Sequence, residues 1–313
     1  MTNLSEFTFL SSDGKTQLHG MLWEPEGVAV RAVLQICHGV AEHIARYDGF
    51  ARALNEQGIV VAGHDHLGHG KSLPEGGTPV YFGEGNTWNT VVDDIYILHQ
   101  RLKQRYPDAP LCIMGHSMGS FLTRTYLIRY PGTVKAAVIM GTGWQPQAAI
   151  TGGLALANAI AAVSGENATS ELVTELAFGS YNKLFAPNRT KVDWLSADES
   201  NVDDYIADPL CGADATVGLF RQMLHGIRFN QRQSHLRQMD REMPVLFVAG
   251  DKDPVGSCGK GVRQTYDAFR AAGMRDCTLK LYPGLRHEIL NEKAYTADIT
   301  KNIEAWLLSR LEK

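Results

Sequence analysis

The chain has 313 residues, of which 44% are hydrophobic and 20% are charged, and its formal net charge is −4 at pH 7. These values are typical of a globular protein with a large core, and they leave no basic surface for nucleic acid or for an anionic membrane. The five cysteines are scattered and lack Cys-x-x-Cys spacing, so we expect a reducing, cytoplasmic location and no cysteine metal site.

The first half of the chain alternates strand and helix patterns. Residues 6–10 and 19–23 flank a Ser-Asp-Gly turn and predict an antiparallel hairpin. Apolar runs then predict four buried strands, at residues 31–37, 59–62, 111–114 and 136–140. Apolar residues at helical spacing predict helices between them, at residues 47–54, 91–102 and 121–130. This alternation favours a mostly parallel sheet covered on both faces.

The alternation stops after residue 143 and resumes after residue 235. The intervening stretch indicates helices, with a small-residue apolar run at 148–163 and a helical pattern around Met223. Two further strands follow, at 245–249 and 277–281, and an apolar helix closes the chain. We therefore predict an α/β core formed by residues 1–143 and 236–313. Residues 144–235 are predicted to be a helical cap inserted into that core.

A Gly-x-Ser-x-Gly motif lies between the third buried strand and its helix, at Gly115, His116, Ser117, Met118 and Gly119. The two glycines let strand and helix approach closely, so the serine would sit on a sharp, strained turn with its hydroxyl exposed. The motif alone is weak, because it also arises by chance around an unreactive turn serine. With a strand before it and a helix after it, the pattern predicts the nucleophile elbow of an α/β-hydrolase.

Chain order selects partners for Ser117. In this fold the acid follows the serine and the histidine comes last, and His287 is the only histidine after residue 235. Two carboxylates follow the first strand after the cap. We prefer Asp253 as the acid, because Pro254 gives it an extended backbone, and we interpret Asp251 as a turn residue. The acid would fix the orientation of the base, which would activate the serine.

A tetrahedral intermediate needs two backbone donors for its oxyanion. Met118 follows the nucleophile at the start of a helix, where amides have no partner. The second donor is predicted to be Val40, in the loop after the strand at residues 31–37, because Gly39 lets the backbone of that loop turn toward the substrate.

Three clustered histidines raise the question of a metal. His64, His66 and His69 lack the i, i+4 spacing of a helical zinc site, so we expect them to pack in a turn. Gly68 and Gly70 do not form a dinucleotide fingerprint, since no helix opens directly after them. We expect neither a metal nor a cofactor.

Several motifs together resemble the monoacylglycerol lipase and lysophospholipase group of α/β-hydrolases, which are serine aminopeptidase S33-like proteins. They lie at residues 38–43, 46–47, 63–72, 115–119, 208–210 and 287–288. The resemblance implies an eight-stranded sheet flanked by helices with an inserted cap. It also implies a Ser117, Asp253, His287 triad, an oxyanion hole of Val40 and Met118, and a mobile cap that admits a lipophilic acyl chain.

We therefore expect a cofactor-free serine hydrolase of monoacylglycerol-like, lysophospholipid-like or other short to medium acyl esters. One alternative is a prolyl-type aminopeptidase, in which cap carboxylates would hold the substrate amine; the candidates are Glu171, Glu175, Asp203, Asp204 and Asp208. Another is a ligand-binding protein of the same fold without catalysis, although such a protein usually lacks a triad member.

The expected partner is a small lipophilic ester, not nucleic acid. No apolar run reaches the ~20 residues of a spanning helix, and the N-terminal residues have neither a basic nor an apolar export region. Residues 150–163 either pack on the core or contact membranes transiently.

Overall fold

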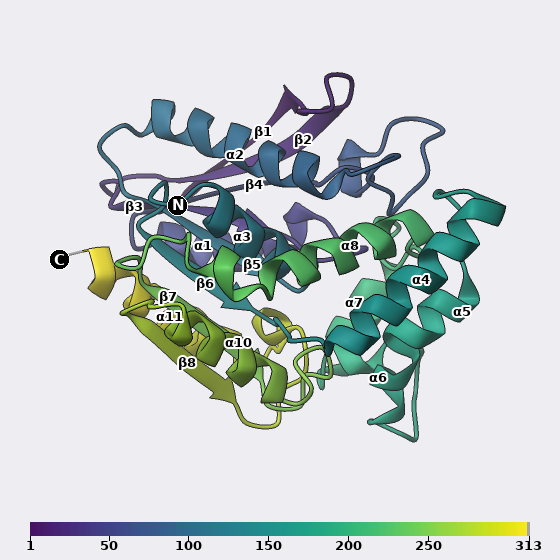
Figure 1. Ribbon diagram of the computed structural model, residues 1–313. Helices are drawn as coiled ribbons and strands as arrows, with labels where there is room; N and C mark the ends of the chain where they lie inside the picture. The colour runs from purple at the N-terminus through teal and green to yellow at the C-terminus, as the bar shows by residue number, and fades with distance from the viewer. Residues whose placement is uncertain (312–313) are drawn as a thin grey trace.

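The computed structural model describes residues 1–311 and contains one eight-stranded sheet (Figure 1). Its strand order is β1-β2-β4-β3-β5-β6-β7-β8. The strands are β1 (Thr2–Leu10), β2 (Gln17–Pro25), β3 (Ala32–Cys37), β4 (Ile59–His64), β5 (Leu111–His116), β6 (Ala136–Met140), β7 (Val245–Gly250) and β8 (Cys277–Tyr282). Strand β2 pairs antiparallel with β1 and β4, and all other pairs are parallel. The predicted mostly parallel sheet of eight strands is confirmed.

Helices cover both faces of the sheet. Every residue of β3 to β7 is buried, as expected for parallel strands packed on two sides. One face packs against α2 (Trp88–Arg105), α3 (Met118–Arg129) and α10 (Lys260–Ala271). The other face packs against α1 (Asp48–Asn55) and α11 (Thr296–Leu311). Short helical turns η1 (Ile44–Tyr47), η2 (Gly70–Ser72) and η5 (Ile289–Asn291) lie in the connecting loops.

The segment between β6 and β7 contributes no strand to the sheet within the described residues. Its helices are α4 (Gln147–Ser164), α5 (Glu171–Thr174), η3 (Glu175–Gly179), α6 (Ser180–Lys183), η4 (Asp193–Leu195), α7 (Glu199–Ala207), α8 (Val217–Asn230) and α9 (Gln233–Leu236). In Figure 1, α4, α5, α6 and α7 gather on the right, and α8 runs back from them toward the core. We call this segment the cap; its boundaries at residues 144 and 235 remain a prediction.

Helix α8 attaches the cap to the core. Asn230 at its end donates to the Phe121 carbonyl at 2.8 Å and accepts from the Thr125 hydroxyl at 2.8 Å, both on α3. These groups are buried, so each hydrogen bond avoids the cost of an unsatisfied polar atom. Helix α8 also packs along α4.

Helix α4 is long and apolar enough to cross a membrane by length and composition, and it is the one such helix among residues 1–311. Only 17% of it is buried, and its buried side chains, Ile150, Leu154 and Ala157, join the core cluster. The expected absence of a spanning segment stays a prediction.

Candidate active site

Ser117 lies between β5 and α3 with φ of +55° and ψ of −123°. This backbone conformation is strained for a side-chain-bearing residue. The close approach around it requires glycine: a Cβ on Gly119 would lie 2.0 Å from the Cys37 carbonyl oxygen, and one on Gly115 would lie 2.2 Å from the Gly119 oxygen. Helix α3 begins at Met118, three residues before the predicted start, because the strained serine ends the strand and opens the helix at once.

Two backbone amides beside Ser117 lack a hydrogen-bond partner in the part of the chain that the structure describes. They belong to Val40 and Met118, the two residues predicted as oxyanion donors. The segment before Val40 lies directly against the serine, since the Cβ position of Gly39 is 3.1 Å from the Ser117 Cβ. Free amides near a hydroxyl can bind an oxygen that gains negative charge during reaction.

His287 and Asp253 meet in the loops after β8 and β7. Asp253 Oδ1 is 3.0 Å from His287 Nδ1, at an angle outside that of a hydrogen bond, and both side chains are almost fully buried. The same oxygen accepts the Val255 amide at 2.9 Å. Asp251 points elsewhere and accepts the Gly284 amide at 2.8 Å, as a turn residue does. Asp253 is therefore the carboxylate beside the histidine.

Ser117 and His287 both line one cavity of about 970 Å³. No hydrogen bond joins the Ser117 hydroxyl to the His287 ring within residues 1–311. The cap forms the opposite wall, and the Trp194 ring lies 5.2 Å from the His287 ring between centroids. The main-chain loop of His287 is held to the cap by the Glu288 amide, which donates to the Leu195 carbonyl at 2.7 Å. The cavity therefore lies between the sheet edge and the cap.

His116, which precedes the nucleophile, contacts two acceptors. Its Nδ1 is 3.2 Å from Glu42 Oε1, and its Nε2 is 3.3 Å from the His287 carbonyl oxygen. Burial opposes protonation, but the hydrogen bond and charge of Glu42 outweigh it and raise the pKa of His116. Both partners are acceptors, so both contacts are hydrogen bonds only when both ring nitrogens carry protons, a form that the raised pKa favours. Through these contacts His116 ties the serine strand to the histidine loop.

A buried ion network surrounds His116. Arg46 binds Glu288 through two hydrogen bonds of 2.7 and 2.8 Å and binds Glu42 at 2.9 Å. Asn201 of α7 adds a hydrogen bond of 2.7 Å to Glu288. The charge of Arg46, with that of His116 when its ring is protonated, balances the two carboxylates, as burial of charge requires. Burial raises the pKa of Glu42, but the contact with His116 overcomes this and holds it well below its usual range.

Sequence reasoning missed the roles of Glu42, Arg46, Glu288 and His116 in this network. A signal was present, because Glu42 and Arg46 carry opposite charges four residues apart, a spacing at which such side chains often pair. Glu288 could not be assigned to them, since 242 residues separate it from Arg46 along the chain.

The predicted histidine turn forms a packed cluster around His38. The His38 ring is 4.2 Å from His66 and 5.4 Å from His69, and His64 is 5.0 Å from His66, all between centroids. All four are buried, and burial lowers the pKa of His64 and His69 to about 3. They are neutral side chains of the core.

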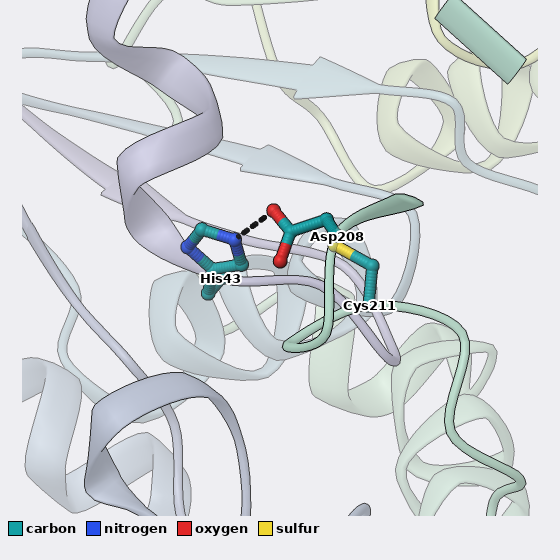
Figure 2. Close-up of side chains that lie close together, drawn as sticks. All are labelled: His43, Asp208 and Cys211. Atoms are coloured by element: carbon teal, nitrogen blue, oxygen red, sulfur yellow. Dashed lines mark hydrogen bonds and ion pairs between the residues drawn. The ribbon is translucent and has the colours of Figure 1, made fainter. Parts of the chain in front are cut away.

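Another group of side chains could hold a metal by donor type: His43, Asp208 and Cys211, whose ligand atoms lie within 4.8 Å of one another (Figure 2). His43 Nε2 and Asp208 Oδ2 are 2.8 Å apart and satisfy each other. Burial, with Asp208 nearby, raises the pKa of the Cys211 thiol. A metal would have to displace this hydrogen bond and ionise that thiol, so we treat the group as a contact between core and cap.

The cap carboxylates considered for amine binding are dispersed. Glu171 and Glu175 line the large cavity, and Glu175 pairs there with Lys183 at 2.7 Å. Asp203 pairs with Arg189 at 2.7 Å, away from the cavity lining.

Comparison with known proteins agrees with this architecture. A family model described as serine aminopeptidase, S33, matches residues 28–294. A monoacylglycerol lipase of Mycolicibacterium smegmatis is 30% identical over 312 residues, which are 98% of each chain. A monoglyceride lipase of Mus musculus is 28% identical over 309 residues, covering 96% of this chain and 90% of the relative.

Among solved structures, a highly thermostable carboxyl esterase from Bacillus coagulans, in complex with glycerol, superposes with a TM-score of 0.92 at 26% identity. The superposition covers 99% of this chain and 100% of the esterase. Because the family model spans most of the sequence and the fold agrees over its whole length, this chain belongs to the serine aminopeptidase S33 family of α/β-hydrolases.

Proposed function

We propose that the chain is a serine ester hydrolase that acts on monoacylglycerol-like or lysophospholipid-like substrates, or on other short to medium acyl esters. The observation that carries the proposal is a strained serine with two free amides nearby and a histidine beside a buried carboxylate in the wall of the same cavity. The names of the relatives, monoacylglycerol lipase and carboxyl esterase, support the substrate class.

The proposed reaction proceeds through an acyl-enzyme. His287 takes the proton of Ser117 as the serine oxygen bonds to the ester carbonyl carbon, and the carbonyl oxygen gains the negative charge. The amides of Val40 and Met118 bind that oxyanion, and Asp253 stabilises the imidazolium. The ester bond to the alcohol breaks as His287 returns the proton to the alcohol oxygen. Water then adds to the acyl-enzyme by the same route and releases the carboxylic acid and free Ser117.

The cap suggests how a lipophilic ester would arrive. Large apolar side chains of α5, η3 and the turn after α6 are exposed, with Leu172, Leu176 and Leu184 at 55%, 65% and 60%. We propose that they and the exposed face of α4 contact a membrane or micelle transiently.

All five cysteines are free, in agreement with the proposed cytoplasmic location.

The test is hydrolysis of a p-nitrophenyl ester series by the wild type and by Ser117→Ala. We expect the variant to be slower by at least about 10⁴-fold, because no other group replaces the nucleophile. Equal rates would refute the assignment. Labelling of folded protein by a fluorophosphonate separates an enzyme from a ligand-binding protein, since only an activated serine reacts.

One observation favours a second candidate, a prolyl-type aminopeptidase. Glu171 lines the cavity without an ion-pair partner among the described residues, so it is available to a substrate amine. Parallel assays on a proline amide and on a monoacylglycerol decide between the two activities. Faster turnover of the amide, with loss of that activity in Glu171→Gln, would replace the ester assignment.

A further inference from the structure

The cap holds the loop that carries Val40 through Ala41, the residue after Val40. Ala41 has a φ of +53°, a conformation that side-chain-bearing residues rarely adopt. Its carbonyl oxygen accepts two hydrogen bonds, from the Tyr205 hydroxyl at 3.0 Å and from the Gly212 amide at 3.0 Å. Both donors belong to the cap. The strained residue Ala41 is therefore held by hydrogen bonds that come from the cap.

Two further contacts join the same segments. His43 Nε2 is 2.8 Å from Asp208 Oδ2, and Figure 2 shows the two side chains facing each other from the core loop and the cap loop. The Arg46 guanidinium lies 5.0 Å from the centre of the Tyr205 ring. Cap residues 205–212 thus contact core residues 41–46 at four separate points.

The side chains at this contact are enclosed. Tyr205 is 8% exposed and His43 is 8% exposed, and the Tyr205 hydroxyl is buried with the carbonyl that it binds. A hydrogen bond away from water is lost at full cost when its donor is removed. Removal of the hydroxyl would leave the Ala41 carbonyl with the Gly212 amide alone. The strained conformation would then be less favoured relative to ordinary ones.

We propose that cap residues 205–212 form a latch that holds the oxyanion loop in its reactive conformation, with Tyr205 and Asp208 as positioning residues. The inference rests on the proposed role of the Val40 amide. When the latch is closed, Ala41 keeps its strained φ and the adjoining amide of Val40 faces the serine. When the latch opens, the loop relaxes and the donor is displaced. The cap would then control turnover as well as access to the cavity.

The first test compares Tyr205→Phe with Tyr295→Phe, a tyrosine that is 49% exposed near α11. Complete loss of one oxyanion donor lowers kcat by about 10²–10³-fold, so a donor displaced part of the time should lower it by about 10-fold. We expect this drop in kcat with KM unchanged for Tyr205→Phe, and no change for Tyr295→Phe. A rise in KM with kcat unchanged would overturn the latch, because Tyr205 would then only bind substrate.

Rescue provides a test that a structural role would not pass. Glycine adopts positive φ without strain, so in Ala41→Gly the loop keeps its conformation with less help from the latch. We expect Tyr205→Phe to lower kcat by less in the Ala41→Gly background than in the wild type, which a double-mutant cycle measures as coupling. Additive effects of the two substitutions would contradict the proposal.

Hydrogen exchange separates failure of the latch from failure of the proposed function. The measurement uses Ser117→Ala protein, because it requires no turnover. Tyr205→Phe and Asp208→Asn should each speed exchange of the Gly39 and Gly212 amides, which donate to Glu42 and to the Ala41 carbonyl, while amides of β5 stay protected. If these amides are unaffected, the latch is refuted whatever the substrate. If they respond but Ser117→Ala retains full ester hydrolysis, the contact stands and the catalytic assignment of the serine is wrong.

Discussion

The carboxyl edge of the sheet and the outer cap are built in opposite ways. At the edge, charged and polar side chains are buried and paired, as in Arg46 between Glu42 and Glu288. In the outer cap, from α5 to α6, apolar side chains such as Leu176 are exposed, and Val173 is the one buried residue of these three short helical elements.

The difference indicates two tasks. Buried ion pairs rarely add stability over apolar packing, yet each partner becomes costly to remove, so such a network fixes geometry. Exposed leucines contribute little to the fold, and we propose that here they provide an apolar surface for lipid. Substitutions at the edge should therefore change chemistry and stability, and substitutions in the outer cap should change the choice of substrate.

The largest expected effect is at the proposed acid, Asp253. Asp253→Asn should lower kcat by about 10⁴-fold, because the neutral amide neither fixes the His287 ring nor stabilises its cation. Asp251→Asn is the matched control, since Asp251 accepts only the Gly284 amide in a turn. Its kcat for a p-nitrophenyl ester should change less than about 10-fold. If Asp251→Asn lowered kcat more than Asp253→Asn, the acid would be Asp251.

The next effect is on stability. Arg46→Met should lower the free energy of unfolding by about 3–5 kcal/mol, because it leaves Glu42 and Glu288 buried without their partner. Arg52→Met is the control: Arg52 pairs with Asp48 on the surface of α1, and its removal should leave urea denaturation unchanged. If the two variants have the same free energy of unfolding, the ion network around Arg46 does not stabilise the carboxyl edge of the sheet.

Acid should destabilise the core through the histidine cluster. The neutral rings of His64 and His69 have folded pKa values of about 3, below the ordinary value of 6.5, so the unfolded chain binds protons first as the pH falls. Stability contributed by each neutral histidine is thus present above pH 6.5 and is lost as the pH falls from 6.5 toward 3.

Each such histidine contributes about 1.4 kcal/mol per pH unit within that window. His64→Leu should reduce the pH dependence of unfolding between these limits by about one proton. Phe9→Leu, which removes the ring packed on His64, should lower stability without changing that slope. An unchanged slope in His64→Leu would mean that this ring does not couple acid to unfolding.

The smallest effect on the fold is expected in the outer cap. Replacing Leu172 and Leu176 by serine should change unfolding by less than about 0.5 kcal/mol each, since both are exposed. KM for a long-chain monoacylglycerol in vesicles should rise several-fold, and KM for a short water-soluble ester should not. Leu10→Ser, an exposed leucine of β1, is the control. Equal changes for both substrates would contradict a surface for lipid.

Local patterns were sufficient for the fold. Apolar runs and helical spacing predicted the order of strands and helices, and the motif around Ser117 predicted the turn where β5 meets α3. These features depend on neighbours a few residues apart, which the sequence displays directly. Chain order added His287, because the fold leaves one histidine in the last segment.

Contacts between distant segments could not be predicted in the same way. Glu288 binds Arg46 across 242 residues, and Ala41 receives its hydrogen bonds from Tyr205 and Gly212 in the cap. Such partners are selected by how the loops meet in space, and many acids, tyrosines and glycines would satisfy the sequence alone. Of the two neighbouring carboxylates, Asp253 lies beside His287, whereas Asp251 accepts the Gly284 amide. The sequence favoured Asp253 through Pro254, but the direction of each side chain was decided by the tertiary structure.

The sequence by itself determined the α/β architecture, the strained serine and the resemblance to a hydrolase group, because each of these is encoded by local spacing. Only the tertiary structure decided the buried ions around the site and the attachment of the cap to the loop that carries Val40. The physical reason is that burial and hydrogen-bond partners arise when remote loops meet at one edge of the sheet.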